Sequence, residues 1–280
     1  MRQMKALSAL LIGGAILVGC SDADNIVTGP GHRSVGAMDL AAPPDQPTPV
    51  DADSVKIVRA SGDISAEVNE YRALLGTLNP NVAGEQPGGR REVNWDAPSV
   101  PATLTNNDLF PGDFFNVSSP RGLLLTTDGT AFRISDIGYI DVNPAYVREF
   151  TPFSPRRLFV ARGSTITDIR FVVAGSSTPA LVTGFGSVFA DVGLFASTTI
   201  QYFDGAGNQL LKIVVPRGND TRGLSFAGAK FPSAIVARVR ITAGDTPIGA
   251  SAFDDVTGPG DKHDIVAMDD FIYGEPRAIN

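Results

Sequence analysis

Ile235-Val236-Ala237-Arg238-Val239-Arg240-Ile241-Thr242 carries apolar side chains at its odd-numbered positions, and Arg, Arg and Thr at its even-numbered positions from 238 onward. Successive side chains of a β-strand point to opposite faces of the sheet. A period of two therefore predicts a strand with one face in a core and the other toward solvent. Residues 169–173 and 181–189 also predict strands, the second because larger side chains alternate with glycines.

Two pairs of apolar runs flank turn residues and predict β-hairpins. Residues 123–126 and 131–135 lie on either side of Asp128-Gly129, and Asp-Gly between apolar runs is a strong hairpin signal. Residues 199–203 and 209–215 are separated by a five-residue loop that contains two glycines, a length suited to a second hairpin. We expect each pair to lie side by side in one sheet.

The chain ends in the stretch 265–273, which is apolar on both faces apart from two adjacent aspartates. Such a strand belongs inside a sheet. Many short strands, 30 glycines, 20 prolines and no long helical pattern favour an all-β fold over an α/β fold. The sequence predicts a jelly-roll-like antiparallel β-sandwich over residues 91–280, preceded by a disordered linker and one short helix.

The helix is predicted over residues 63–78, where apolar side chains recur at intervals of three and four. Asp63 is the expected N-cap and Gly76 the expected stop. An isolated helix of this length is marginal in water. Its apolar stripe therefore docks either on the following domain, which we favour, or on a partner.

Two segments have the composition of linkers. Residues 20–60 contain four prolines between positions 43 and 49 among Ala, Asp, Gln and Thr, which predicts a disordered linker. Within the region 61–90, the helix is followed by a stretch rich in Pro, Gly and Asn, which predicts a second linker.

The N-terminus has the pattern of an export signal. Two basic residues precede an apolar run over residues 6–18, which is shorter than the roughly 20 residues that a membrane-spanning helix needs. The run ends in Leu17-Val18-Gly19-Cys20, which resembles the lipobox of bacterial lipoproteins. That resemblance implies cleavage of the signal peptide 1–19, acylation of Cys20 and, because Ser21 follows, an outer-membrane location in a host that has two membranes.

Charge and cysteine content fit such a protein. Cys20 is the single cysteine of the chain, so no intramolecular disulfide can form. Removal of residues 1–19 takes away two positive charges and changes the formal charge from −7 to −9. An acidic chain without a basic stretch has no electrostatic footprint for nucleic acid. We expect the contact with the membrane to come from lipid.

Four stretches of the body carry a further resemblance, to a group of uncharacterised bacterial secreted β-sandwich proteins that implies no activity. They are Asn94-Trp95-Asp96, Pro111-Gly112-Asp113-Phe114-Phe115-Asn116, Ser119-Pro120-Arg121-Gly122 and Met268-Asp269-Asp270-Phe271-Ile272-Tyr273. More loosely, a last strand ending in Asp-Asp-Phe is similar to galactose-binding-like jelly rolls. This second resemblance implies the architecture of many carbohydrate-binding modules.

The residue inventory argues against catalysis. His263 is the histidine of the body, it lies in a polar turn, and the chain has no Gly-x-Ser-x-Gly nucleophile elbow. Asp269 and Asp270 are neighbours on a strand, so their side chains are expected on opposite faces, where they cannot act on one bond. We therefore expect no enzymatic activity.

The acids near the C-terminus still need partners, because a carboxylate in an apolar strand is costly when it is unpaired. Arg238 or Arg240 on a neighbouring strand is the explanation that we favour. The alternative is a structural calcium ion, which takes six to eight oxygen ligands. Its expected ligands come from a run of aspartates that also includes Asp254 and Asp255, namely Asp261, Asp264, Asp269 and Asp270.

Two functions remain open. A binding module, with glycan as its expected ligand, predicts Trp95, Tyr139 and Tyr146 on an exposed platform where aromatic rings stack on sugars. A structural or adhesive surface protein without a small ligand predicts the same aromatic residues in the core. Tryptophan is often buried without any ligand, so for Trp95 we favour core packing.

Overall fold

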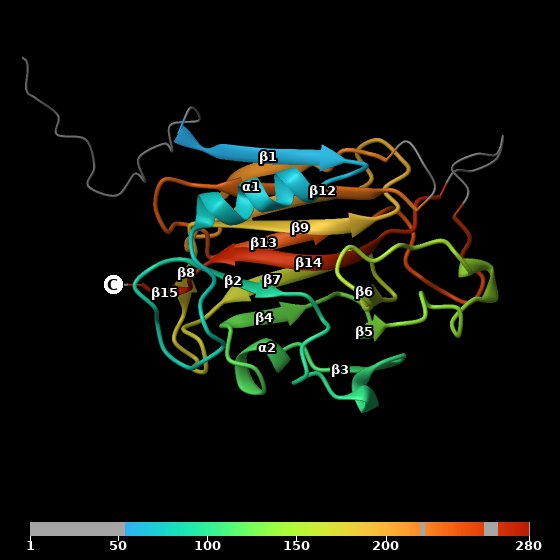
Figure 1. Ribbon diagram of the computed structural model, residues 1–280, viewed down its shortest axis with the longest axis horizontal. Coiled ribbons are helices and arrows are strands. Elements are labelled where there is room, and N and C mark those ends of the chain that lie inside the picture. Colours follow the sequence, from blue (N-terminus) through green and yellow to red (C-terminus); the bar gives the residue numbers. More distant parts are fainter. Residues whose placement is uncertain (1–53, 219–221, 255–262, 280) are drawn as a thin grey trace, which may run out of the picture. The chain divides into compact units, whose positions relative to one another are not determined.

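The computed structural model describes residues 54–218, 222–254 and 263–279 (Figure 1). The chain divides into two units, Met1–Pro47 and Thr48–Asn280, and all described residues belong to the second. The predicted signal peptide, Cys20 and most of the first predicted linker lie outside the described residues, as does Asp261. Within the described ranges, no helix has the length and apolar character needed to cross a bilayer.

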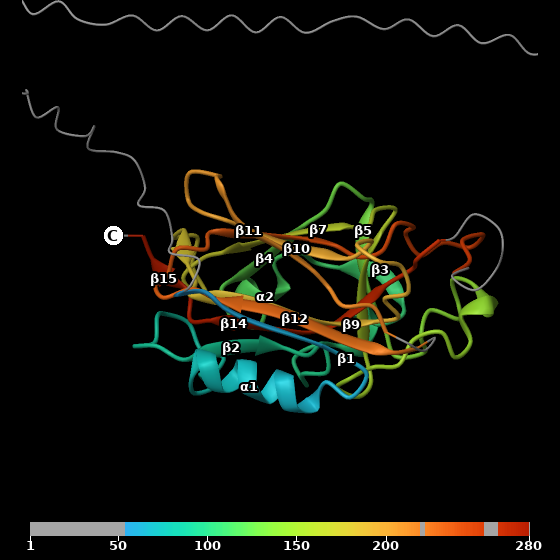
Figure 2. The same ribbon diagram turned by 90° about the horizontal axis from the view of Figure 1, so that it is seen from above.

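Two antiparallel sheets pack face to face, which confirms the predicted β-sandwich (Figures 1 and 2). The larger sheet has the order β1 (Lys56–Ser61), β12 (Leu224–Lys230), β9 (Gly184–Ala190), β14 (Ala267–Gly274), β6 (Leu158–Arg162), β5 (Ala131–Ser135) and β3 (Asn107–Phe110), and β2 (Arg90–Val93) also pairs with β14. The smaller sheet has the order β11 (Gln209–Val214), β10 (Thr199–Phe203), β13 (Arg238–Thr242), β7 (Ile166–Phe171) and β4 (Leu123–Thr126). The short strands β8 (Ala180–Leu181) and β15 (Arg277–Ala278) form a separate pair.

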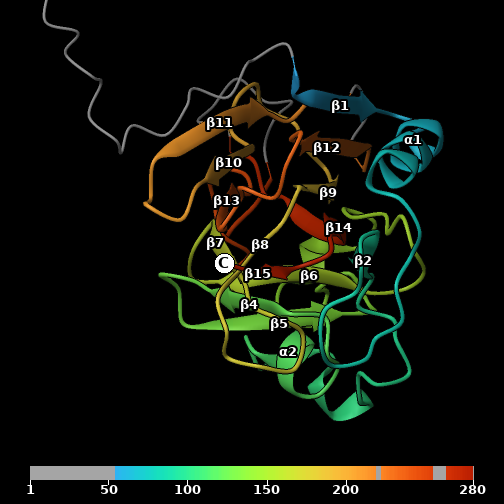
Figure 3. The same ribbon diagram turned by 90° about the vertical axis from the view of Figure 1, so that its left-hand side faces the viewer.

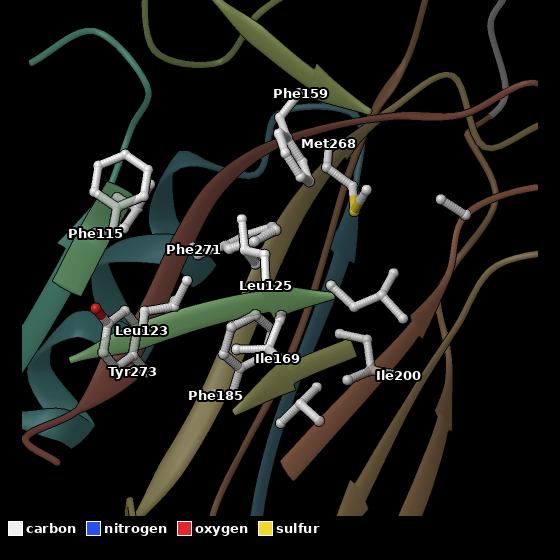
Figure 4. Close-up of a cluster of buried hydrophobic side chains, with 14 of the residues drawn as sticks. Phe115, Leu123, Leu125, Phe159, Ile169, Phe185, Ile200, Met268, Phe271 and Tyr273 are labelled. Atoms are coloured by element: carbon white, nitrogen blue, oxygen red, sulfur yellow. The ribbon is translucent and has the colours of Figure 1, made fainter. Parts of the chain in front are cut away.

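The core lies between the two sheets. Val239 and Ile241 of β13 are buried, as the alternation predicts. The predicted strand is too long at its start, because β13 begins at Arg238 and, before it, Val236 is buried while Ile235 and Ala237 are only partly buried. In Figure 4, Leu125 and Ile169 of the smaller sheet lie close to Phe185 and Phe271 of the larger one. β14 is buried along its whole length between β9 on one side and β2 and β6 on the other, so the last strand lies inside a sheet as predicted.

One predicted hairpin is confirmed and the other is wrong. β10 and β11 pair antiparallel around a loop in which the Asp204 carboxylate accepts backbone N–H groups. β4 and β5, by contrast, belong to different sheets, because β4 pairs with β7 and β5 pairs with β6. The Asp128-Gly129 turn therefore carries the chain from one sheet to the other. This turn lies against a second connection between the sheets, the one from β6 to β7. The two are so close that a Cβ on Gly129 would stand 2.1 Å from the carbonyl oxygen of Arg162.

The predicted helix is α1 (Ser65–Leu75), which packs on the outer face of the larger sheet (Figure 2). It begins two residues after the expected N-cap Asp63, and it ends at Gly76, whose φ of 97° suits glycine. The Tyr71 ring lies flat on Gly186 and Gly228, where an added Cβ would come within 2.8 to 3.0 Å of it. The Tyr71 hydroxyl donates to the carbonyl of Ala229 at 2.8 Å. The helix thus docks on its own domain.

Both predicted linkers need correction. The first one is not a linker at its C-terminal end, because β1 pairs with β12 over six residues. The second is held against the sandwich by the buried Arg91–Glu275 ion pair. The Arg91 guanidinium donates to the carbonyl of Pro80 at 2.6 Å, and the backbone N–H of Gln86 donates to Glu275 at 3.1 Å. Satisfied backbone groups fix this stretch, although its composition is typical of a flexible linker.

Three short helical turns complete the described elements. They are η2 (Ala102–Leu104), α2 (Phe114–Val117) and η3 (Pro144–Tyr146). α2 closes the core next to β4, and η3 belongs to the long connection between β5 and β6.

Candidate functional site

The three aromatic residues expected on a sugar-binding platform are all buried. The Trp95 ring stacks on Phe159 with a centroid distance of 4.1 Å, and its Nε1–H donates to the carbonyl of Asp269 at 3.0 Å. Tyr139 and Tyr146 pack in a second cluster around Phe150. The prediction that these rings form an exposed platform is therefore wrong. Their apolar area is used to close the core, which is the outcome that we favoured for Trp95.

Asp269 and Asp270 converge, although neighbouring strand residues normally point to opposite faces. β14 has a β-bulge, because Met268 pairs with Phe189 of β9 while Phe271 pairs with Ser187. Two residues of β14 therefore lie opposite one residue of β9. The bulge turns both carboxylates toward Ser154, whose Oγ lies 3.1 Å from Asp269 Oδ1 and 2.7 Å from Asp270 Oδ1. The expectation of opposite faces is wrong for this reason.

This carboxylate pair is partnered from the loop before β6 and from α1. The backbone N–H groups of Phe153 and Ser154 donate to Asp269 at 2.6 and 3.1 Å, and Arg72 pairs with Asp270 at 3.1 Å. Burial raises the pKa of Asp269 well above its usual range, with a further contribution from the charge of Asp270. Burial also raises the pKa of Asp270. The pair therefore joins three elements of the fold, namely β14, the loop before β6 and α1.

The arginines that we expected beside these acids bind elsewhere. Arg238 and Arg240 both pair with Asp168 of the neighbouring strand β7, at 2.8 and 2.5 Å. The hydrogen bonds of these two arginines lower the pKa of Asp168, against an opposing effect of burial. An arginine does pair with Asp270, as we expected, but it is Arg72 of α1 and not Arg238 or Arg240.

The predicted calcium ligands do not form one group among the described residues. Asp264 lies apart from the β14 pair and accepts hydrogen bonds from the backbone N–H of Gly193 at 2.8 Å and from the Ser197 hydroxyl. A different set offers carboxylate oxygens that all lie within 4.8 Å of one another, and it consists of Glu149, Asp191 and Asp254. Of these three, the sequence analysis named only Asp254.

His263 lies on the surface. Thr246 Oγ1 is 3.0 Å and Asp245 Oδ1 is 3.8 Å from the same ring nitrogen, Nδ1. In a Ser-His-Asp relay the nucleophile and the acid contact different nitrogens of the ring. This arrangement is therefore not a relay geometry.

The strands β1 and β11, which are edge strands of the two sheets, lie at the same end of the sandwich (Figure 3). An exposed aromatic ring borders a groove beside them. The Phe195 side chain, in the loop between β9 and β10, is 81% exposed. It borders a groove of about 550 Å³ together with Arg59 of β1 and the segment Val214–Arg217. No carboxylate is among the described residues that line it. This groove therefore combines an apolar ring with two positive charges on an acidic chain.

A larger hollow of about 600 Å³ lies near the C-terminal pair β8–β15. It contains charges of both signs; three of the four charged side chains that line it are paired within the protein, and Lys230 forms no ion pair among the described residues. Glu275 pairs with Arg91 at 2.6 Å, and Arg277 pairs with Glu85 at 3.1 Å. Among the described residues, neither Arg59 nor Arg217 of the groove forms an ion pair. For a charged ligand the groove is therefore the better candidate, although it is the smaller hollow.

The sequence contains a signal for this groove. Phe195 lies in Gly193-Leu194-Phe195-Ala196-Ser197, directly after a strand, where a large apolar residue has no alternating partner. Pro216-Arg217 likewise follows a strand. Apolar and basic residues in loops at strand ends are better candidates for binding than aromatic residues inside strand patterns.

Comparisons with known proteins add little. No protein-family model and no curated protein matches the chain. Among solved structures, the enzymatically active domain of tailspike protein 4 of bacteriophage CBA120 is similar at 15% identity and a TM-score of 0.18, over 51% of this chain and 21% of that chain. A similarity at this level carries no argument about function. The resemblance to uncharacterised secreted proteins stays a prediction.

Proposed function

We propose that the chain is an exported, lipid-anchored β-sandwich that binds an acidic glycan in the groove formed by Arg59, Phe195 and Arg217. The observation that carries the proposal is the exposed Phe195 ring in one groove with Arg59 and Arg217, two arginines that form no ion pair with any described residue. Burial of a phenylalanine side chain is worth roughly 1.5–3 kcal/mol, so a ligand that covers this ring gains binding energy. The role is binding and not catalysis.

The chemistry of the groove selects the ligand class. An aromatic ring packs against the apolar face of a sugar ring. A guanidinium group binds carboxylate or phosphate oxygens through two parallel hydrogen bonds. A groove of about 550 Å³ falls in the size range of small-molecule sites, which suits a few sugar units. A polysaccharide with uronic acid or phosphate groups meets both requirements.

The groove is tested on a glycan array with the mature chain (residues 20–280, Cys20→Ser). We expect saturable binding to acidic glycans that weakens as salt rises, because charge pairs near the surface are screened. Phe195→Ala and Arg217→Ala should each weaken binding at least about tenfold, since aromatic residues and arginine dominate binding sites.

Two matched variants control this experiment. Leu109→Ala removes another exposed apolar side chain, on β3, and Arg156→Ala removes another exposed arginine. Both should bind like the unmodified chain. Equal binding by all four variants would place the ligand elsewhere on the molecule and reject the groove.

The lipid anchor rests on the lipobox-like residues Leu17-Val18-Gly19-Cys20. Two acyl chains hold a protein on a bilayer far better than one, since each buried methylene contributes about 0.8 kcal/mol. We expect the intact chain in the membrane fraction and Cys20→Ala in the soluble or unprocessed fraction. Recovery of Cys20→Ala in the membrane fraction after processing would contradict the anchor.

The alternative is a structural or adhesive surface protein without a small ligand. The burial of Trp95, Tyr139 and Tyr146 favours it, because it is the arrangement that this alternative predicts. Absence of binding to every glycan by a folded chain would support the alternative and reject the groove's proposed ligand.

A further inference from the structure

Three carboxylates from three separate loops meet beside the end of β9. Asp191 directly follows β9, Glu149 follows the η3 turn, and Asp254 lies in the connection between β13 and β14. One carboxylate oxygen from each lies within 4.8 Å of those of the other two. Calcium–oxygen distances are 2.3–2.6 Å, so oxygens bound to one ion lie up to about 5 Å apart. The three groups are therefore close enough to share an ion.

One oxygen in this group is buried and has no partner. The Asp191 side chain is only 2% exposed. Its Oδ1 accepts the backbone N–H of Arg222 at 3.0 Å, whereas its Oδ2 has no hydrogen-bond partner. Asp254 Oδ1 is likewise buried without a partner. A buried acceptor left unsatisfied costs about 1–3 kcal/mol, more when it is charged. Two such oxygens in one acidic group are acceptors that a bound cation would satisfy.

The surrounding hydrogen bonds hold two of the three loops together. The Tyr146 hydroxyl donates to the carbonyl of Ala252 at 2.8 Å, and the Asn143 side-chain amide donates to the same oxygen at 2.9 Å. The backbone N–H of Glu149 donates to the carbonyl of Tyr146 at 3.0 Å. Tyr146 therefore joins the loop that bears Glu149 to the loop that bears Asp254. Hydrogen bonds that do not involve the carboxylates therefore help to position Glu149 and Asp254.

We propose that Glu149, Asp191 and Asp254 form a binding site for a calcium ion. The three ligands are all carboxylate oxygens, which hard cations prefer, and no sulfur or imidazole ligand belongs to the group. Calcium accepts six to eight oxygens in a flexible geometry, so water and backbone carbonyls can complete its shell. Magnesium requires a near-ideal octahedron at shorter distances and keeps most of its water.

The electrostatics agree with this assignment. Burial and the neighbouring charge of Asp191 raise the pKa of Glu149 to about 7. The same causes, in the same order, raise the pKa of Asp254 to about 9. Without a cation, Glu149 and Asp254 thus resist ionisation beside Asp191. A divalent ion removes this mutual repulsion.

The test is a calorimetric titration of calcium chloride into the mature chain (residues 20–280, Cys20→Ser) after treatment with chelator. We expect about one ion per chain, with a Kd of roughly 10⁻⁴–10⁻³ M as in extracellular calcium modules. Asp191→Asn and Glu149→Gln should each raise the Kd at least about tenfold. Glu70→Gln makes the same change at an exposed carboxylate of α1 and should leave the Kd unchanged.

Thermal unfolding separates an ion site from a merely structural role of Asp191. Without calcium, Asp191→Asn should melt higher than the unmodified chain, because it removes the charge that disfavours ionisation of Glu149 and Asp254. With 10 mM calcium, a concentration of about ten times the expected Kd or more, the order should reverse. A variant that is less stable in both conditions would contradict the proposal.

Two other outcomes would overturn the site. One is the absence of any heat from the folded, unmodified chain, and the other is equal binding by Asp191→Asn, Glu149→Gln and Glu70→Gln. No glycan is present in these measurements, so their failure leaves the proposed groove untouched. Failure of the glycan array equally leaves the calcium site untouched.

Discussion

Trp95→Ala is expected to lower the free energy of unfolding by about 3–5 kcal/mol. The side chain is fully buried and contacts four phenylalanine rings, with centroid distances between 4.1 and 5.9 Å to Phe110, Phe115, Phe159 and Phe271. Alanine leaves a cavity at this point of the core. It also leaves the carbonyl of Asp269 without the indole N–H that it accepts.

The measurement is urea unfolding followed by far-UV circular dichroism. Tryptophan fluorescence is unsuitable because Trp95 is the single tryptophan of the chain. Domains are typically stable by about 5–15 kcal/mol, so the variant should unfold at a much lower urea concentration. Leu109→Ala, at a side chain that is 68% exposed, serves as the control and should change stability by less than about 0.5 kcal/mol. An unchanged midpoint for Trp95→Ala would contradict the core role of this ring.

Arg91→Ala is expected to cost about 3–5 kcal/mol, because it leaves a buried carboxylate without its counter-charge. The side chains of Arg91 and Glu275 are 0% and 1% exposed, and the guanidinium contacts both carboxylate oxygens at 2.6 and 2.7 Å. It also donates to the carbonyls of Pro80 and Pro120. The loss should lower the melting temperature by roughly 6–20 °C, at about 2–4 °C per kcal/mol for a domain of this size.

A surface pair provides the comparison. Arg277 and Glu85 form an ion pair of 3.1 Å in which the side chains are 46% and 31% exposed. Arg277→Ala should cost about 0–1 kcal/mol, since exposed ion pairs are screened by water. The double variant Arg91→Met with Glu275→Leu should recover part of the loss, because no buried charge remains. If Arg91→Ala and Arg277→Ala had equal effects on stability, the buried Arg91–Glu275 pair would not be what holds residues 79–90 against the domain.

The sequence predicted those parts of the fold that local periodicity determines. The alternation within residues 238–242 is matched by the buried Val239 and Ile241 of β13, and the spacing over residues 65–75 is matched by α1; both elements are shorter than predicted. The failures concern contacts between distant segments. An Asp-Gly turn specifies a reversal of the chain, but not whether the second strand returns to the same sheet. Composition alone likewise could not reveal that Arg91 would hold a Pro- and Gly-rich stretch against the domain.

The candidate sites were harder to predict for a related reason. The density of aspartates over residues 254–270 predicts a calcium site made of residues that are close in the sequence. The carboxylates that meet instead come from positions 149, 191 and 254. The groove likewise combines residue 59 with residues 195 and 214–217. A single sequence carries no sign of such distant pairings. The β-bulge at Asp269 and Asp270 is a further case, because it reverses the direction that strand periodicity assigns to one of them.

The position of β1 determines how mechanical force enters this domain. β1 is an edge strand with one neighbour, β12, and its first pair is Lys56 with Lys230. A pull on the preceding chain along the strand axis loads six residue pairs at once in shear. A pull across the axis opens the same pairs one after another from Lys56. In either case the next element to receive the load is α1, which Tyr71 holds on the sheet. A chain tethered through its N-terminus would therefore bear tension first on an edge strand that pairs with a single neighbour, and not on a strand inside the sheet.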